Sequence, residues 1–203
     1  MNKNTTFSIN SNEKIIIEHN ACINDLSCYC EIPIILLCKN GSYIVSIDNM
    51  HDTLLVFAEQ LYKVLYNMLP IHNSIQTSIG YIYNEYLQNT YNKKGMYTSN
   101  LVYTLQDGIE SWIGNEYKLW GYGSIVSWLY NDANGSIIFE VTPVYPGGFG
   151  NPERKAKANV AYKEWLITYK PYYIGEISHA TAQQWLKQAQ AILNQIEKNI
   201  QLI

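Results

Sequence analysis

The sequence is short of charged residues. Of its 203 residues, only 15% are Asp, Glu, Lys or Arg, against about a quarter in typical soluble proteins. Arg154 is the sole arginine, and the formal net charge is only −3. Domains that bind nucleic acid usually carry a basic stripe with arginine forks, so we expect no nucleic-acid partner. The hydrophobic share of 47% is ordinary for a folded globular protein.

Signals for export and for membrane insertion are missing as well. The first residues, MNKNTTFSINSNEK, lack the apolar run of a signal peptide. No stretch approaches the roughly 20 apolar residues that a membrane-spanning helix needs. We therefore expect a cytoplasmic protein with no membrane association, whose cysteines remain thiols.

Motifs of metal and nucleophile chemistry are incomplete. The four cysteines follow the spacing C-x5-C-x-C-x7-C, which lacks the paired knuckles of zinc sites: Cys22, Cys28, Cys30 and Cys38. The histidines are scattered without metal-binding spacing: His19, His51, His72 and His179. We expect no metal and no cofactor, and a zinc module remains an alternative that depends on the cysteines alone.

The hydrophobic pattern predicts an α+β fold, with an antiparallel sheet of hairpins packed against helices. Strands are predicted at 13–20, 32–50 and 172–178, with a tight turn at 39–41. Helices are predicted from about 50 to Leu69, with Asp48, Asn49 or Asp52 as the cap, over 152–170, and at the C-terminus after a Ser178 cap. The apolar stripe of the first helix is expected to cover the preceding hairpin, with Leu54, Leu55, Ala58, Leu61, Tyr62, Leu65 and Leu69. Residues 75–87 fit either a helix or a strand, and residues 107–112 fit a short helix or a turn. We expect one domain over 1–203, and a division into layers 1–70 and 71–203 is an alternative.

The densest aromatic stretch runs from Trp120 to Phe149, WGYGSIVSWLYNDANGSIIFEVTPVYPGGF. It predicts a hairpin of strands 117–130 and 136–145 around the turn-forming segment 131–135. A four-residue loop over 132–135 would place Trp128 opposite Phe139 and Tyr122 opposite Tyr145. The same register would place Glu140 opposite Ser127, and strict alternation would then turn Glu140 toward solvent.

The aromatic residues of this hairpin are expected to serve two purposes. Trp128, Phe139 and Val141 are predicted to lie in the core, where cross-strand pairs stabilise a sheet. Aromatic side chains at the open end are suited to anchor a partner protein. The predicted partner-binding residues are Trp120, Tyr122, Tyr145, Phe149 and Glu116.

The order of segments resembles the immunity proteins of bacterial polymorphic-toxin and contact-dependent growth inhibition systems. The similar segments are a β-rich start, DTLLVFAEQLYKVLYNML, LWGYGSIVSWLYNDANGSIIFEVTPVYP and ATAQQWLKQAQAILNQIEKNI. The resemblance implies a small, non-enzymatic cytoplasmic inhibitor that binds the active site or an exosite of one cognate toxin domain. The net charge is weaker than that of the acidic inhibitors of nucleases, which argues against a nuclease partner.

An alternative hypothesis is a small enzyme or ligand-binding module. It would use a pocket near the 117–145 hairpin, between that hairpin and the C-terminal helices. Glu140 or Cys38 would be its reactive group.

Overall fold

Two antiparallel four-stranded sheets and four α-helices make up most of the computed structural model, which describes residues 4–18, 31–73, 75, 78–92, 102–104, 110–147 and 155–200. The N-terminal sheet has the order β1 (Asn4–Ser8), β2 (Lys14–Glu18), β3 (Glu31–Cys38), β4 (Gly41–Asn49). The central sheet has the order β10 (Tyr173–Ile177), β9 (Ile137–Pro143), β8 (Ile125–Asn131), β7 (Lys118–Tyr122). The predicted α+β fold class is confirmed.

The remaining elements connect and cover these sheets. The helices are α1 (Met50–Leu65), α2 (Ile79–Asn92), α3 (Lys155–Ile167) and α4 (His179–Ile200). A short pair of strands, β5 (Val102–Thr104) and β6 (Glu110–Trp112), precedes the 3-10 helix η1 (Ile113–Tyr117). No helix among the described residues is long and apolar enough to cross a membrane.

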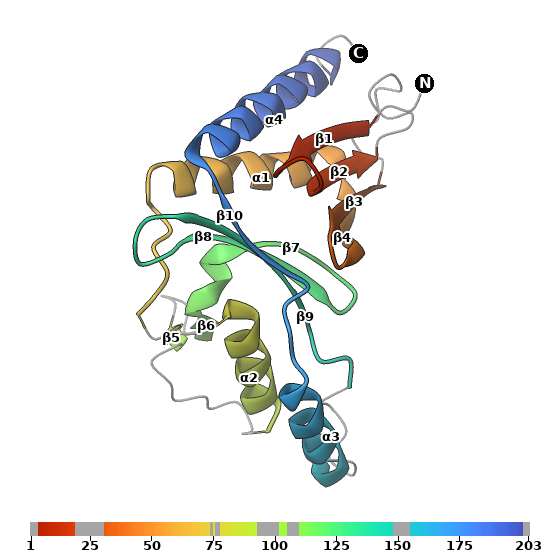
Figure 1. Cartoon of the computed structure of the whole chain (residues 1–203), viewed down its shortest axis with the longest axis vertical. Helices are drawn as coiled ribbons and strands as arrows, with labels where there is room; N and C mark the ends of the chain where they lie inside the picture. Colours follow the sequence, from red (N-terminus) through yellow and green to blue (C-terminus); the bar gives the residue numbers. More distant parts are fainter. Residues whose placement is uncertain are drawn as a thin grey trace.

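The central sheet is covered by helices on both faces. Figure 1 shows α1 and α4 on one side of it, and α2 and α3 on the other. One continuous hydrophobic core links these layers, and Phe57 of α1 is among its fully buried residues. The Phe57 ring centroid lies 5.1 Å from that of Phe7 on β1 and 4.9 Å from that of Trp120 on β7. The core therefore joins both sheets through α1.

The start of α1 follows the predicted capping chemistry, but its end does not. Asn49 is the N-cap, and its side-chain oxygen accepts a hydrogen bond from the Asp52 N–H at 2.8 Å. The helix ends at Leu65, four residues before the predicted end at Leu69. The Asn131 side chain of β8 donates to the Val64 carbonyl at 2.8 Å, and the Asn131 N–H donates to the Leu69 carbonyl. These hydrogen bonds hold the segment from Val64 to Leu69 against β8, which accounts for the early end of the helix.

The structure resolves the two ambiguous segments. Residues 79–92 form a helix although they include Gly80. A Cβ at position 80 would overlap the Thr142 side chain of β9. Gly80 thus allows α2 to pack closely on the sheet. Of the segment 107–112, residues 110–112 form a strand and residues 107–109 lie outside the described residues, and the 3-10 helix begins at Ile113.

The central hairpin is confirmed, but its predicted register is wrong by one residue. Trp128 lies opposite Glu140, and Leu129 lies opposite Phe139. The loop is shorter than predicted, because the Asp132 N–H donates to the Ser136 carbonyl and the Gly135 N–H donates to the Asp132 carbonyl. Gly135 has a φ of 83°, as the last position of a three-residue hairpin loop requires.

The predicted first strand of this hairpin is in fact two strands. It turns at Gly123, whose φ is 57°, so that β7 folds back on β8 and Tyr122 lies opposite Ile125. The predicted pairing of Tyr122 with Tyr145 is therefore wrong.

The burial of Glu140 also differs from the prediction. Alternation assumes one wet face, but both faces of this sheet are covered, so Glu140 is fully buried. The predicted core positions Trp128, Phe139 and Val141 are confirmed as buried.

Candidate functional site

The predicted partner-binding residues do not gather into one exposed patch. Trp120 is 5% exposed and packs against Phe57, and its backbone N–H donates a hydrogen bond to Ser127 Oγ at 3.0 Å. Tyr122, two residues further along β7, is 46% exposed. The open end of the hairpin thus contributes one core residue and one surface residue from the same strand.

The other predicted residues lie on separate surfaces. The Tyr145 ring is half-buried against α3, with centroid distances of 5.4 Å to both Tyr162 and Trp165. Glu116 is exposed on the 3-10 helix. Phe149 lies outside the described residues.

Glu140 lies at the centre of a buried polar network between β9 and the start of α2. Its oxygens accept hydrogen bonds from the Ser78 hydroxyl, from the Gly80 N–H at 3.1 Å and from the Tyr130 hydroxyl at 3.1 Å. The Ser78 hydroxyl also lies 2.9 Å from the Tyr169 hydroxyl, beyond α3. The network therefore ties two helical segments to the sheet.

This carboxyl is held in place for a structural reason. Burial raises the pKa of Glu140, and the hydrogen bonds from Ser78, Gly80, Tyr130 and Ile79 partly offset that rise. The Ile79 and Gly80 N–H groups at the first turn of α2 donate to the carboxylate, so Glu140 caps the helix together with Ser78, whose hydroxyl accepts from the Tyr81 N–H. Its oxygens are engaged in anchoring α2, in contrast to the hypothesis of a reactive group open to a pocket.

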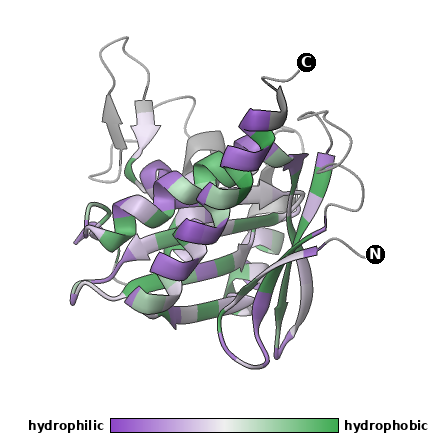
Figure 2. Cartoon of the chain, turned by 90° about the horizontal axis from the view of Figure 1, so that it is seen from above, coloured by the Kyte–Doolittle hydropathy of each residue, from purple (hydrophilic) through white to green (hydrophobic). Residues whose placement is uncertain are grey.

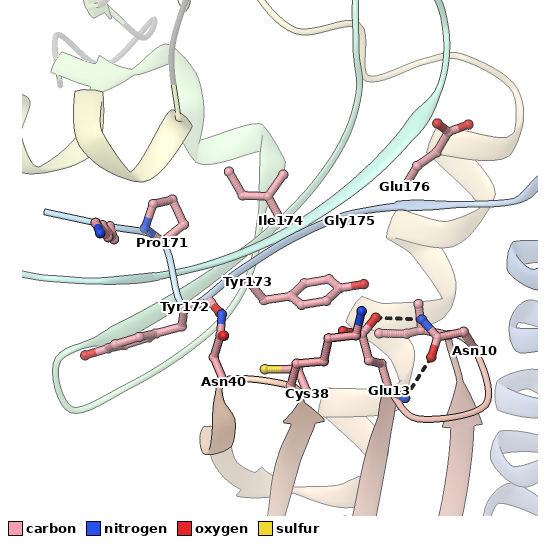
Figure 3. A pocket seen from close by; sticks show the side chains of 13 residues that line it. Asn10, Glu13, Cys38, Asn40, Pro171, Tyr172, Tyr173, Ile174, Gly175 and Glu176 are labelled. Carbon is pink, nitrogen blue, oxygen red and sulfur yellow. Dashed lines mark hydrogen bonds between the residues drawn. The ribbon is translucent and has the colours of Figure 1, made fainter.

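Cys38 does line a pocket, although not one at the predicted position. A pocket of about 740 Å³ lies between β10 and the hairpin tips of the N-terminal sheet. Figure 3 shows the Tyr172 and Tyr173 rings extending in opposite directions along the gap, with Cys38 and Asn40 on its other side. The Asn40 side chain crosses the gap and donates to the Tyr172 carbonyl at 3.2 Å.

Carboxyl and hydroxyl groups meet in this pocket. The Glu13 carboxylate receives a hydrogen bond from the Asn10 side chain at 2.6 Å. Burial, followed by the negative charge of Glu13 beside it, raises the pKa of Tyr173 to about 12. Next to the paired strands β9 and β10, the Ser136 hydroxyl donates a hydrogen bond to the Glu176 carboxylate at 3.2 Å. The pocket has the size and the mixture of polar and apolar walls that binding sites use.

A second surface lies on the outward face of α1, beside α4. Five large hydrophobic residues are exposed on α1 and on the turn that follows it: Leu55, Val56, Tyr62, Tyr66 and Met68. Four residues of this set and of α4 border a groove of about 380 Å³: Leu55, Tyr62, Met68 and Leu193. Figure 2 looks onto these helices and shows hydrophobic and hydrophilic residues interleaved on them. We call this surface the α1–α4 groove.

The α1–α4 groove was missed by the sequence prediction, although a signal for it exists. Leu55 and Tyr62 were assigned to the core-facing stripe of the helix, and the structure corrects this, since both are exposed. The buried large hydrophobic residues of α1 are Met50, Leu54, Phe57, Leu61 and Val64. The apolar residues of α1 thus span more of the helix circumference than the face packed on the core, and this width is the signal in the sequence.

The predicted absence of a metal site is not contradicted by the part of the chain that the structure describes, in which no three potential ligands cluster. Cys38 is a free thiol there, while Cys22, Cys28 and Cys30 lie outside that part. His51 lies 3.2 Å from the Asp52 carboxylate and 3.9 Å from that of Glu197, at the ends of α1 and α4.

Comparison of this chain with protein families, with curated proteins and with solved structures finds no match. The α+β architecture described above is therefore established by the structure alone.

Proposed function

We propose that this chain is a non-enzymatic binding protein of the bacterial cytoplasm that neutralises a cognate toxin domain, and that the α1–α4 groove receives that domain. The observation that carries the proposal is the exposed apolar face of α1, where Tyr62 and Tyr66 are 49% and 66% exposed. Several large hydrophobic side chains exposed close together commonly mark an interaction site.

The chemistry of the groove supports a protein partner. The Tyr62 and Tyr66 rings lie 4.7 Å apart, so a partner would meet a paired aromatic anchor rather than a single flexible side chain. Tyrosine is enriched at the energetic centres of interfaces because it buries a large area while its hydroxyl stays hydrogen-bonded. Glu59 and Lys63 border the same groove and provide the polar rim that such interfaces have.

Co-expression tests the proposal. The reading frame next to the gene is expressed with this chain, and growth and co-purification are measured. We expect protection from toxicity and a stable complex with the wild-type chain. The double variant Tyr62→Ala/Tyr66→Ala should lose both while remaining folded, since its rings are exposed.

Ile167→Ala is the matched control, because Ile167 on α3 is an apolar residue that is 85% exposed and lies on the other side of the sheet. It should leave the complex intact. A neighbouring product that is not toxic and does not co-purify contradicts the proposed function. A complex that survives the double variant refutes the role of the α1–α4 groove.

A further inference from the structure

The pocket beside β10 follows the edge of a sheet. β10 is the last strand of the central sheet, with β9 on one side only. Successive side chains of a strand point to opposite faces, so a pocket on one face would touch every second residue. This pocket is lined by the continuous run 170–176, so it lies along the open edge of the strand. An open edge presents unpaired N–H and C=O groups.

The edge is recessed, which restricts what can pair with it. The β1–β2 turn, with Asn10 and Glu13, and the β3–β4 turn, with Asn40, form the opposite wall. The pocket of about 740 Å³ between β10 and these hairpin tips leaves room for one extended segment. The edge of a second copy would carry its own hairpin tips into the same space, so pairing of two copies through β10 is disfavoured.

Charge is distributed unevenly along the groove. Lys39 and Lys170 border it where β10 begins, next to the contact between Asn40 and Tyr172. Glu176 borders it where β10 ends, and Figure 3 places Glu176 and Asn10 at the opposite end from Pro171. A complementary segment therefore has an acidic residue near Lys170 and a basic residue near Glu176.

We propose that this groove binds an extended peptide segment of another protein, which adds to the central sheet as a strand antiparallel to β10. Main-chain hydrogen bonds to the β10 edge supply the affinity. For a segment in this direction, the charges at the two ends of the groove decide which charged residue comes first. In the antiparallel direction the basic residue is N-terminal and the acidic residue C-terminal. The inference goes beyond the proposed function, because it concerns a different surface and needs no toxin.

Synthetic peptides test it directly on the full chain. The probe is a capped peptide of alternating valine and threonine, with lysine at its N-terminal end and glutamate at its C-terminal end. Binding is followed by NMR titration, and amide hydrogen exchange is measured in the complex. We expect saturable binding and new protection of amides within Tyr173–Ile177. The peptide with its two charged ends exchanged should bind less tightly.

Charge reversal on the protein provides the matched test. Glu176→Lys and Lys170→Glu should each weaken binding of the first peptide about threefold or more. Glu164→Lys and Lys163→Glu make the same changes on exposed positions of α3 and should leave it unchanged. The inference is overturned if neither peptide binds, or if protection appears away from β10. Concentration-dependent protection of β10 in the free protein would also overturn it, since a second copy would then occupy the edge.

Discussion

The Glu140 carboxylate, in the middle of the central sheet, accepts a hydrogen bond from the backbone N–H of Gly80 at 3.1 Å. This contact joins two residues 60 positions apart in the chain. Gly80 is also the position where a side chain would collide with Thr142. The same residue thus provides both the close approach of α2 to β9 and one of the hydrogen bonds that fix it there.

Removal of the carboxyl should therefore destabilise the protein strongly. Glu140→Ala leaves the Ser78, Gly80 and Tyr130 donors without their acceptor in a buried site, which should lower the free energy of unfolding by about 2–4 kcal/mol. Urea denaturation measures the change. Glu176→Ala is the control, because Glu176 is an exposed glutamate on β10 and its loss should cost about 0.5 kcal/mol or less. Equal losses in the two variants would contradict the anchoring role.

The raised pKa of Glu140 gives its stability contribution a definite pH dependence. Because the folded state holds this proton more tightly than the unfolded state, Glu140 favours folding most below its unfolded pKa. The contribution then falls as pH rises toward the raised folded pKa. The unfolding free energies of wild type and Glu140→Gln are measured at pH values between the unfolded and the folded pKa of Glu140. Their difference cancels the effect of the other titrating groups, which both proteins share. Wild type should lose stability relative to Glu140→Gln with rising pH, and a difference that grows in favour of wild type would refute the direction.

The hairpin loop makes a separate prediction. Gly135 has a φ of 83°, where a Cβ is strained, so Gly135→Ala should destabilise the protein by about 1 kcal/mol. Gly121→Ala is the matched control, since Gly121 lies on β7 without a positive φ and an added methyl group would meet only ordinary contacts. It should be neutral or slightly stabilising. Thermal unfolding of both variants distinguishes these outcomes.

The sequence predicted which segments form helices and strands better than it predicted which side of each element is buried. The N-terminal hairpin, the Asn49 cap and the C-terminal helix after Ser178 follow from local signals, and all three are present. The register of the central hairpin was wrong because the loop length decides it, and Asp132 and Gly135 close the loop one residue earlier than expected.

The candidate sites were harder to predict because they depend on tertiary cover. Alternation along β9 could not show that α2 covers the second face and buries Glu140. Periodicity along α1 could not show which part of its apolar arc stays exposed beside α4. The groove at β10 needs two hairpin tips distant in sequence, around Glu13 and Asn40, to meet one strand.

Truncation of Trp120 and truncation of Tyr122, both on β7, should change the stability of the protein by different amounts. Trp120→Ala removes a buried ring from its contact with Phe57 and should cost about 3–5 kcal/mol of unfolding free energy. Tyr122→Ala removes a ring that is largely exposed and should change stability by about 0.5 kcal/mol or less. Urea denaturation measures both.

If Tyr122 also contributes to partner binding, Tyr122→Ala should weaken the complex without unfolding the chain. A large stability loss in Tyr122→Ala would instead make it a core residue and remove it from the set of partner-binding candidates.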